Sequence, residues 1–116
     1  MKYALSHPEI RAAVVKLCAG FPGAYWRDLD QTQAYPVDFV AALTREGYLS
    51  ALVPEEYGGS GLPLSAAAAI LEEVHRSGGN AAACHAQMYT MGTLLRHSSD
   101  AQKHAWLPSI AEGALR

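Results

Sequence analysis

Apolar residues recur every three or four positions along most of the chain, which is the spacing of one face of an α-helix. This pattern predicts helices over residues 8–21, 36–47, 65–76, 81–97 and 100–113, with one or two helical turns over 24–33. The predicted buried positions are Ile10, Val14, Leu17, Cys18 and Phe21 in the first helix, Phe39, Val40 and Leu43 after Pro36, and Ala67, Ile70, Leu71 and Val74 after the glycine-rich loop.

Capping and breaking residues separate these segments. Ser6 and Glu9 match the capping box S-x-x-E at the start of the first helix, with Pro8 tolerated in its first turn. Pro108 is predicted to kink or split the last helix. The predicted N-caps of the later helices are Ser65, Asn80 and either Ser98 or Ser99. The predicted stops are Phe21-Pro22-Gly23, Gly47 and Gly78-Gly79.

The helix predicted over 81–97, AAACHAQMYTMGTLLRH, is apolar on most of its circumference. Such a helix belongs in the middle of a bundle, where other helices cover it on several sides. No segment shows the strict alternation of a half-buried strand, and no repeat or low-complexity linker interrupts the chain. We therefore predict an all-α fold, a bundle of five to six helices.

The composition adds one feature, an unusually apolar surface. Hydrophobic residues make up 50% of the 116 residues and charged residues only 17%, whereas ordinary soluble domains carry about 25% charged residues. A single small domain has much surface for its volume, so it should need more polar residues rather than fewer. We therefore expect apolar helix faces that are covered by self-association, as in a homo-oligomer, or by a larger assembly.

Charge and targeting signals narrow the classes of partner. The net charge is −2 and the Lys and Arg residues form no stripe, which argues against nucleic-acid binding. No stretch approaches the ~20 apolar residues of a membrane span, and Glu9, Arg11 and Lys16 interrupt any signal-peptide run. Cys18 and Cys84 fit apolar helical patterns, as core residues do in a reducing compartment. We expect a cytoplasmic protein without nucleic-acid or membrane partners.

The segment VPEEYGGSGLPLS at residues 53–65 raises the question of a phosphate-binding loop. Its GGSG has neither the spacing of G-x-x-x-x-G-K-[ST] nor that of G-x-G-x-x-G, and no strand precedes it. The preferred interpretation is a sharp turn between packed helices, in which glycines adopt backbone angles that other residues avoid.

The remaining candidate groups form no catalytic or metal-binding pattern. The histidines are irregularly spaced, and His97 and His104 are predicted at exposed helix ends. The adjacent pair Glu72-Glu73 diverges on a helix, so a solvated face is expected instead of an acid/base pair. Cys84 and His85 point about 100° apart on a helix, which is poor geometry for a thiolate–imidazole pair. The residues alone predict no catalytic residue, no cofactor-binding residue and no metal ligand.

Two stretches together resemble the acyl-CoA dehydrogenase family: VPEEYGGSGL, and ILEEVHRSGGNAAACHAQMYTMGTLLRHSSDAQKHAWLPSIAEGALR. In that family a helical N-terminal domain carries a loop like (I/V)PEEYGG-G, a helix with two glutamates, a central helix and a segment like GS-EQK-(R/K)YLP. Each has a counterpart here in the same order, and the resemblance runs from about Leu5 to Arg116. It implies that residues 1–116 form this N-terminal helical domain.

The resemblance implies a function in fatty acid metabolism, the α,β-desaturation of acyl-CoA thioesters, with FAD as cofactor of the complete enzyme. Family members continue into a β-domain with most flavin contacts and a C-terminal helical domain with the catalytic glutamate. This chain stops at GALR, where the β-domain would begin, so we expect a fragment that is inactive and binds no FAD by itself. Two alternatives stay open, a stand-alone helical interaction domain and part of a related flavoprotein oxidase or monooxygenase.

The resemblance also implies a substrate site. In the family, the helix that matches Ala81–Arg96 lines the acyl-chain pocket. Within it, His85, Met88, Tyr89 and Gly92 fall at i, i+3, i+4 and i+7 and share one face, so they are the predicted substrate-binding residues. Without the resemblance, the same spacing describes a face that packs in the core.

Overall fold

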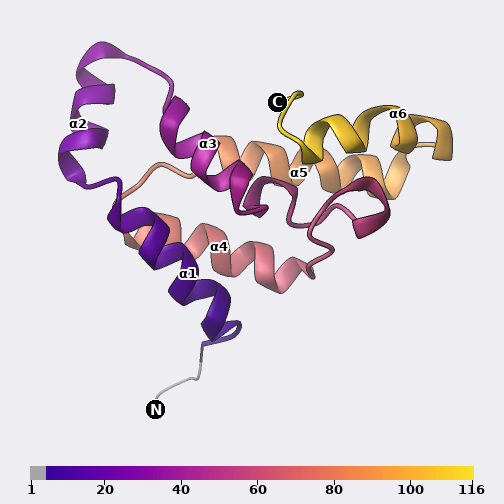
Figure 1. The fold of residues 1–116 in the computed structure, drawn as a ribbon, viewed down its shortest axis with the longest axis horizontal. Coiled ribbons are helices and arrows are strands. Elements are labelled where there is room, and N and C mark those ends of the chain that lie inside the picture. Colours follow the sequence, from indigo (N-terminus) through magenta and orange to yellow (C-terminus); the bar gives the residue numbers. More distant parts are fainter. Residues whose placement is uncertain (1–4) are drawn as a thin grey trace.

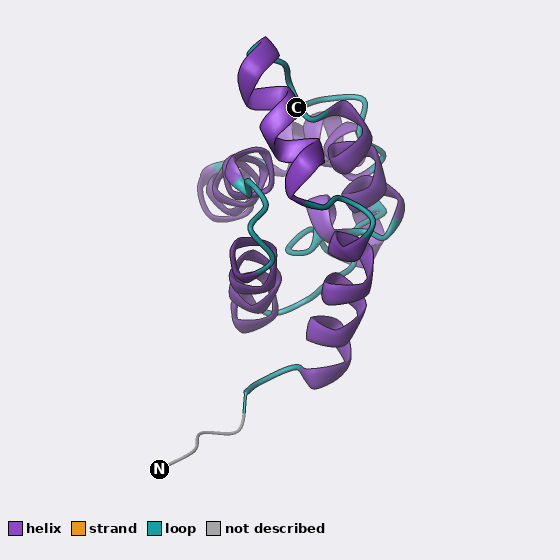
Figure 2. Cartoon of the chain, turned by 90° about the vertical axis from the view of Figure 1, so that its left-hand side faces the viewer, coloured by secondary structure: helices purple, strands orange, loops and turns teal. Residues whose placement is uncertain are grey.

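The computed structural model describes residues 5–116 and contains helices and loops, with no strand in that range (Figure 1, Figure 2). The predicted all-α fold of five to six helices is therefore confirmed. The elements of the described chain are α1 (Pro8–Ala19), α2 (Gly23–Thr32), α3 (Val37–Arg45), the short 3-10 helices η1 (Tyr48–Ser50) and η2 (Glu55–Tyr57), α4 (Leu64–Arg76), α5 (Ala82–His97) and α6 (Asp100–Ala111).

The helices form a flat body of 43 × 42 × 20 Å. α1 packs along α4, whereas α5 contacts α3, α4, α6 and η1. α4 and α5 run antiparallel, joined by the short loop 77–81 (Figure 1). α5 thus contacts four other elements, but it is covered less than predicted, because only Cys84, Gln87, Met88 and Met91 are buried while one side that includes His85, Tyr89 and Thr93 is exposed.

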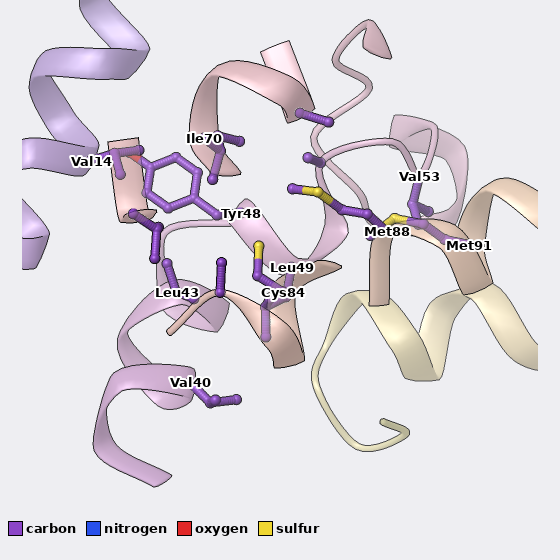
Figure 3. Close-up of a cluster of buried hydrophobic side chains, with 14 of the residues drawn as sticks. Val14, Val40, Leu43, Tyr48, Leu49, Val53, Ile70, Cys84, Met88 and Met91 are labelled. Atoms are coloured by element: carbon purple, nitrogen blue, oxygen red, sulfur yellow. The ribbon is translucent and has the colours of Figure 1, made fainter. Parts of the chain in front are cut away.

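One hydrophobic core joins six of these elements, because Leu107 and Ile110 of α6 belong to it as well. Side chains from α1, α3, η1, α4 and α5 point into a common interior, where Figure 3 labels Val14, Leu43, Tyr48, Ile70 and Met91 among others. The predicted buried positions on α1, α3 and α4 all belong to this core or pack against it. Those that are only partly buried are Ile10, Leu17, Phe21 and Leu71.

α2 is attached through a cluster of aromatic rings, because none of its own residues is fully buried. The ring of Phe39 lies edge-to-face at 5.2 Å from Phe21 and 4.8 Å from Trp26, measured between ring centroids. The Phe39 N–H also donates to the Tyr25 hydroxyl at 3.3 Å. α2 has 10 residues, longer than the one or two turns predicted, since these tertiary contacts stabilise a helix that its polar sequence alone does not signal.

The predicted capping box at Ser6 and Glu9 is wrong. α1 begins at Pro8, its N-cap is His7 with φ 53° and ψ 56°, and no side chain caps it. A residue before proline avoids the right-handed helical region, so His7 cannot serve as the first helical residue that a Ser6 cap requires. Instead the His7 Nε2 lies 2.9 Å from the Ser65 Oγ and links the start of α1 to α4.

The other predicted helix ends are partly right. Ser99 caps α6 and forms a capping box with Gln102. The Asn80 side chain accepts the Ala82 N–H at 2.8 Å, although Ala81 holds the N-cap position. Ser65 caps nothing, because α4 begins one residue earlier, directly after a proline. Pro108 does not split α6, which runs through it as one helix.

The glycine-rich loop folds back on η1 and η2. Each N–H from residue 58 to residue 62 donates to a backbone carbonyl of residues 50–55. Gly58 and Gly61 have φ of 88° and 61°, and a Cβ on Gly59 would lie 2.1 Å from the Val53 carbonyl oxygen. The loop is a tight turn that needs glycine, as predicted, and its engaged N–H groups offer no cradle for a phosphate.

The predicted solvated face holds for Glu72, which is 49% exposed, but is wrong for Glu73. The Arg11 Nη1 on α1 lies 2.8 Å from the Glu72 Oε1 and 3.0 Å from the Glu73 Oε1, and Glu73 is only 4% exposed. The hydrogen bond to Glu73 raises the pKa of Arg11 further above its usual value. Adjacent helical side chains diverge, but a guanidinium placed between them contacts both, so this ion cluster fixes α1 on α4.

Candidate functional site

The candidate site is a groove of about 400 Å³ between α4 and α5. Its α5 wall consists of His85, Met88, Tyr89, Gly92, Thr93, Arg96 and His97. Its other wall consists of Leu52 before the glycine-rich loop and of Leu64, Ala67, Ala68 and Leu71 on α4. We call this hollow the α4–α5 groove. Its size falls within the range of small-molecule sites, roughly 300–1,000 Å³.

All four predicted substrate-binding residues line the α4–α5 groove. Met88 forms its inner side and is only 4% exposed, whereas Tyr89 is 60% exposed at the rim. The His85 and Tyr89 rings pack edge-to-face with centroids 5.4 Å apart. Gly92 leaves open space, since a Cβ there would meet nothing within 4 Å. The structure thus brings these residues together as an apolar inner side, an aromatic rim and a gap.

The opposite wall was missed in the sequence, although a signal for it exists. Ala67 and Ala68 belong to the run AAAA, and small side chains leave room between two helices where larger ones would fill it. Ala67 was assigned only to the core, because the periodicity marks the buried stripe of α4 and not the space beside it. Arg96 and His97 were missed because they lie at the helix end, where charged side chains usually face water.

The titratable side chains that line the groove are His85, Tyr89, Arg96 and His97, and no thiol is among them. No Asp or Glu lines it. Cys84 lies on α5 but is buried in the core, and burial raises the pKa of its thiol to about 12, so it stays protonated and unreactive at neutral pH. Its neighbour His85 is exposed on another side of the helix, as predicted. What this arrangement can do is bind an apolar chain.

Two further properties concern the described chain as a whole. Within residues 5–116, no group of three His, Cys, Asp or Glu side chains is placed to hold a metal ion. His97 is exposed at the end of α5, as predicted, whereas His104 is exposed but lies in the second turn of α6, with its ring edge-to-face at 5.2 Å from that of Tyr57. Across the same residues, no helix combines the length and the apolar character needed to cross a membrane.

Comparison with known proteins gives the family. The model for the acyl-CoA dehydrogenase N-terminal domain matches residues 6–114. The probable acyl-CoA dehydrogenase fadE25 of Mycobacterium leprae is 38% identical over 94% of this chain and 28% of its own length. The (2S)-methylsuccinyl-CoA dehydrogenase of Cereibacter sphaeroides is 34% identical over 69% of this chain and 15% of its own length.

The fraction of each relative's length that this chain spans shows how much of the longer protein it corresponds to. The FadE25 protein of Mycobacterium tuberculosis is 32% identical over 94% of this chain, which again spans 28% of that relative's length. The chain therefore corresponds to little more than a quarter of these mycobacterial relatives. No solved structure matches it significantly. The family match over residues 6–114 nevertheless covers almost every described element, and the chain belongs to the acyl-CoA dehydrogenase family as its N-terminal helical domain.

Proposed function

We propose that this chain serves a flavin-dependent acyl-CoA dehydrogenase as its N-terminal helical domain and that its α4–α5 groove receives the acyl chain. The reaction of the complete enzyme would be the α,β-desaturation of an acyl-CoA thioester. The single observation that carries the proposal is the groove itself, whose inner side combines the flexible thioether of Met88 with the open space at Gly92. A thioether adapts to an apolar chain, and the gap leaves room for one.

The names of the relatives support the same substrate class. Those from Mycobacterium are named acyl-CoA dehydrogenases, and the one from Cereibacter sphaeroides is named for a particular acyl-CoA. All these names describe thioesters of coenzyme A with an organic acid. We carry over this class and not a particular acid.

FAD is the cofactor that the family implies, and it would accept the electrons of the desaturation when bound. The described residues do not fit its pyrophosphate at the glycine-rich loop, because each N–H of residues 58–62 already donates to a carbonyl. We therefore derive no step through the flavin, and we propose that its main contacts come from outside residues 5–116. The part of this chain is to bind and orient the acyl group.

The 116 residues purified alone are expected to retain no flavin and to leave an electron-accepting dye unreduced with any acyl-CoA. The physical reason is that the groove lining contains no carboxylate that could remove the α-proton, and that the glycine loop offers no free N–H groups to FAD. Absorption spectra after purification with added FAD, together with dye-reduction assays, check this. A yellow preparation or dye reduction would contradict it.

The DNA that follows codon 116 separates the proposal from the stand-alone interaction domain. An in-frame flavin-binding domain, with dye reduction by the longer product, would support the dehydrogenase. A stop codon there, together with a chain that binds no acyl-CoA, would favour the interaction domain. Acyl-CoA-dependent hydroxylation or peroxide formation by the longer product would instead indicate the related monooxygenase or oxidase.

Self-association of the 116 residues is expected, because large apolar side chains are exposed. Tyr89, Trp106 and Leu115 are 60%, 49% and 37% exposed and line one hollow between α5 and α6, and lone soluble domains rarely expose contiguous apolar patches beyond a few hundred Å². Sedimentation equilibrium should give a mass that rises with concentration, and Trp106→Gln should lower it. A monomer at high concentration that binds no hydrophobic dye would count against this.

We also propose that the protein functions in a reducing compartment such as the cytoplasm, because Cys18 and Cys84 are buried free thiols.

A further inference from the structure

The α4–α5 groove has one charged end. Arg96 lines it one helical turn after Gly92, near the C-terminal end of α5. The rest of the lining is mainly aliphatic or aromatic, and it includes no Asp or Glu. An unsubstituted alkyl chain carries no acceptor that could pair with the guanidinium, so binding of such a chain does not account for Arg96.

Arg96 differs from the other arginines near α4. Arg11 and Arg76 both pair with Glu72, at 2.8 and 2.9 Å. The Arg96 side chain forms no ion pair with any carboxylate of residues 5–116 and donates no hydrogen bond within that range. Its planar donors are therefore free, at the end of an apolar groove, for an anion that arrives from outside. A guanidinium binds a carboxylate or a phosphate through two parallel hydrogen bonds.

We propose that the α4–α5 groove selects ligands in which an apolar chain ends in an anion, with the anion paired to Arg96 and the chain along Met88 and Gly92. This rests on the proposed function, because it specifies the substrate class of the same groove. Two sources could supply the anion: a carboxylate at the far end of the acyl group, or a phosphate of the coenzyme A portion. The distance along α5 from His85 at one end to Arg96 at the other is about 16 Å at 1.5 Å per residue, enough for an extended chain to span.

The test compares probes that share one chain and differ in charge. Decanoate and 1-decanol are titrated into the 116-residue chain, and the Met88 methyl and Gly92 amide signals are followed by NMR. Decanoate should bind about fivefold more tightly than 1-decanol, the upper range for an exposed ion pair. Arg96→Gln should remove this difference, Arg96→Lys should keep part of it, and ~1 M salt should abolish it because an exposed pair is screened.

These titrations separate failure of the charge selection by Arg96 from failure of the proposed acyl-chain site. If neither probe moves the Met88 and Gly92 signals, the groove does not bind an acyl chain, and both the proposed function and the charge selection are wrong. If 1-decanol binds as tightly as decanoate and Arg96→Gln changes nothing, only the charge selection falls, and Arg96 merely complements the dipole at the C-terminus of α5. Arg96 is exposed, so its replacement should not unfold the chain.

A third arm identifies the source of the anion. Free coenzyme A, which carries phosphates and no acyl group, is titrated into the original chain and into Arg96→Gln. Unchanged coenzyme A binding together with weakened decanoate binding would assign the anion to the acyl group. Weakened binding of coenzyme A with unchanged decanoate affinity would overturn that assignment and place a phosphate at Arg96. Arg76→Gln, on α4 but outside the groove, is the matched control that should alter neither.

Discussion

Gly92→Leu is expected to shift the acyl preference of the complete enzyme strongly toward short chains. The ratio of kcat/KM for decanoyl-CoA over that for butyryl-CoA should fall by about 10- to 200-fold, the value of roughly one methylene of space in an apolar pocket. The new side chain would project into the gap of the α4–α5 groove, where a Cβ meets nothing within 4 Å. Assays of a flavin-loaded enzyme that carries this domain measure the ratio.

The variant should fold normally, which makes the result interpretable. Leucine is a better helix former than glycine by about 0.8 kcal/mol, so the thermal unfolding midpoint should stay or rise. Thr90→Leu is the matched control, because Thr90 is exposed on the same helix outside the groove. An unchanged chain-length profile in a folded, flavin-loaded Gly92→Leu enzyme would place the acyl pocket elsewhere.

Phe39→Ala is expected to lower the free energy of unfolding by about 3–5 kcal/mol, the usual loss for a buried phenylalanine. Phe39 is 1% exposed and its ring contacts both Phe21 and Trp26, so its removal leaves a cavity and loosens the attachment of α2. Small domains are stable by only about 5–15 kcal/mol in total. Urea unfolding followed by circular dichroism measures the loss.

Val37→Ala provides the comparison, since Val37 lies on the same helix and is 64% exposed. An exposed substitution away from special features should change the free energy of unfolding by about 0.5 kcal/mol or less. If Phe39→Ala cost no more than Val37→Ala, the aromatic cluster would not stabilise the fold as described.

The helices were predictable because their information is local. A 3.6-residue period with glycine stops specifies α3 and α4 almost to the residue, and Phe39, Ile70 and Val74 are buried as the period requires. Tertiary context decides what the period cannot. Pro108 removes one backbone donor, yet Leu107 and Ile110 on either side of it are buried in the core and α6 continues through it.

Long-range polar contacts were not predictable from spacing. Glu73 looks solvated within its own helix, where Arg76 lies 3.6 Å from its carboxylate, and the hydrogen bond at 3.0 Å that accompanies its burial comes from Arg11, 62 positions away in the chain. Residue spacing also does not predict the α4–α5 groove. The period places His85, Met88, Tyr89 and Gly92 on one face, but whether that face packs in a core or lines a hollow depends on how α4 lies against it.

The central claim is that the α4–α5 groove holds the acyl chain, and nuclear Overhauser contacts test it most directly. The 116-residue chain with labelled methionine methyls is mixed with decanoyl-CoA. We predict contacts from the acyl chain to Met88, which lines the groove, and none to Met91, which is fully buried in the core three residues later. Contacts to Trp106 on α6 without any to Met88 would contradict the claim, because they would place the acyl chain in the hollow between α5 and α6.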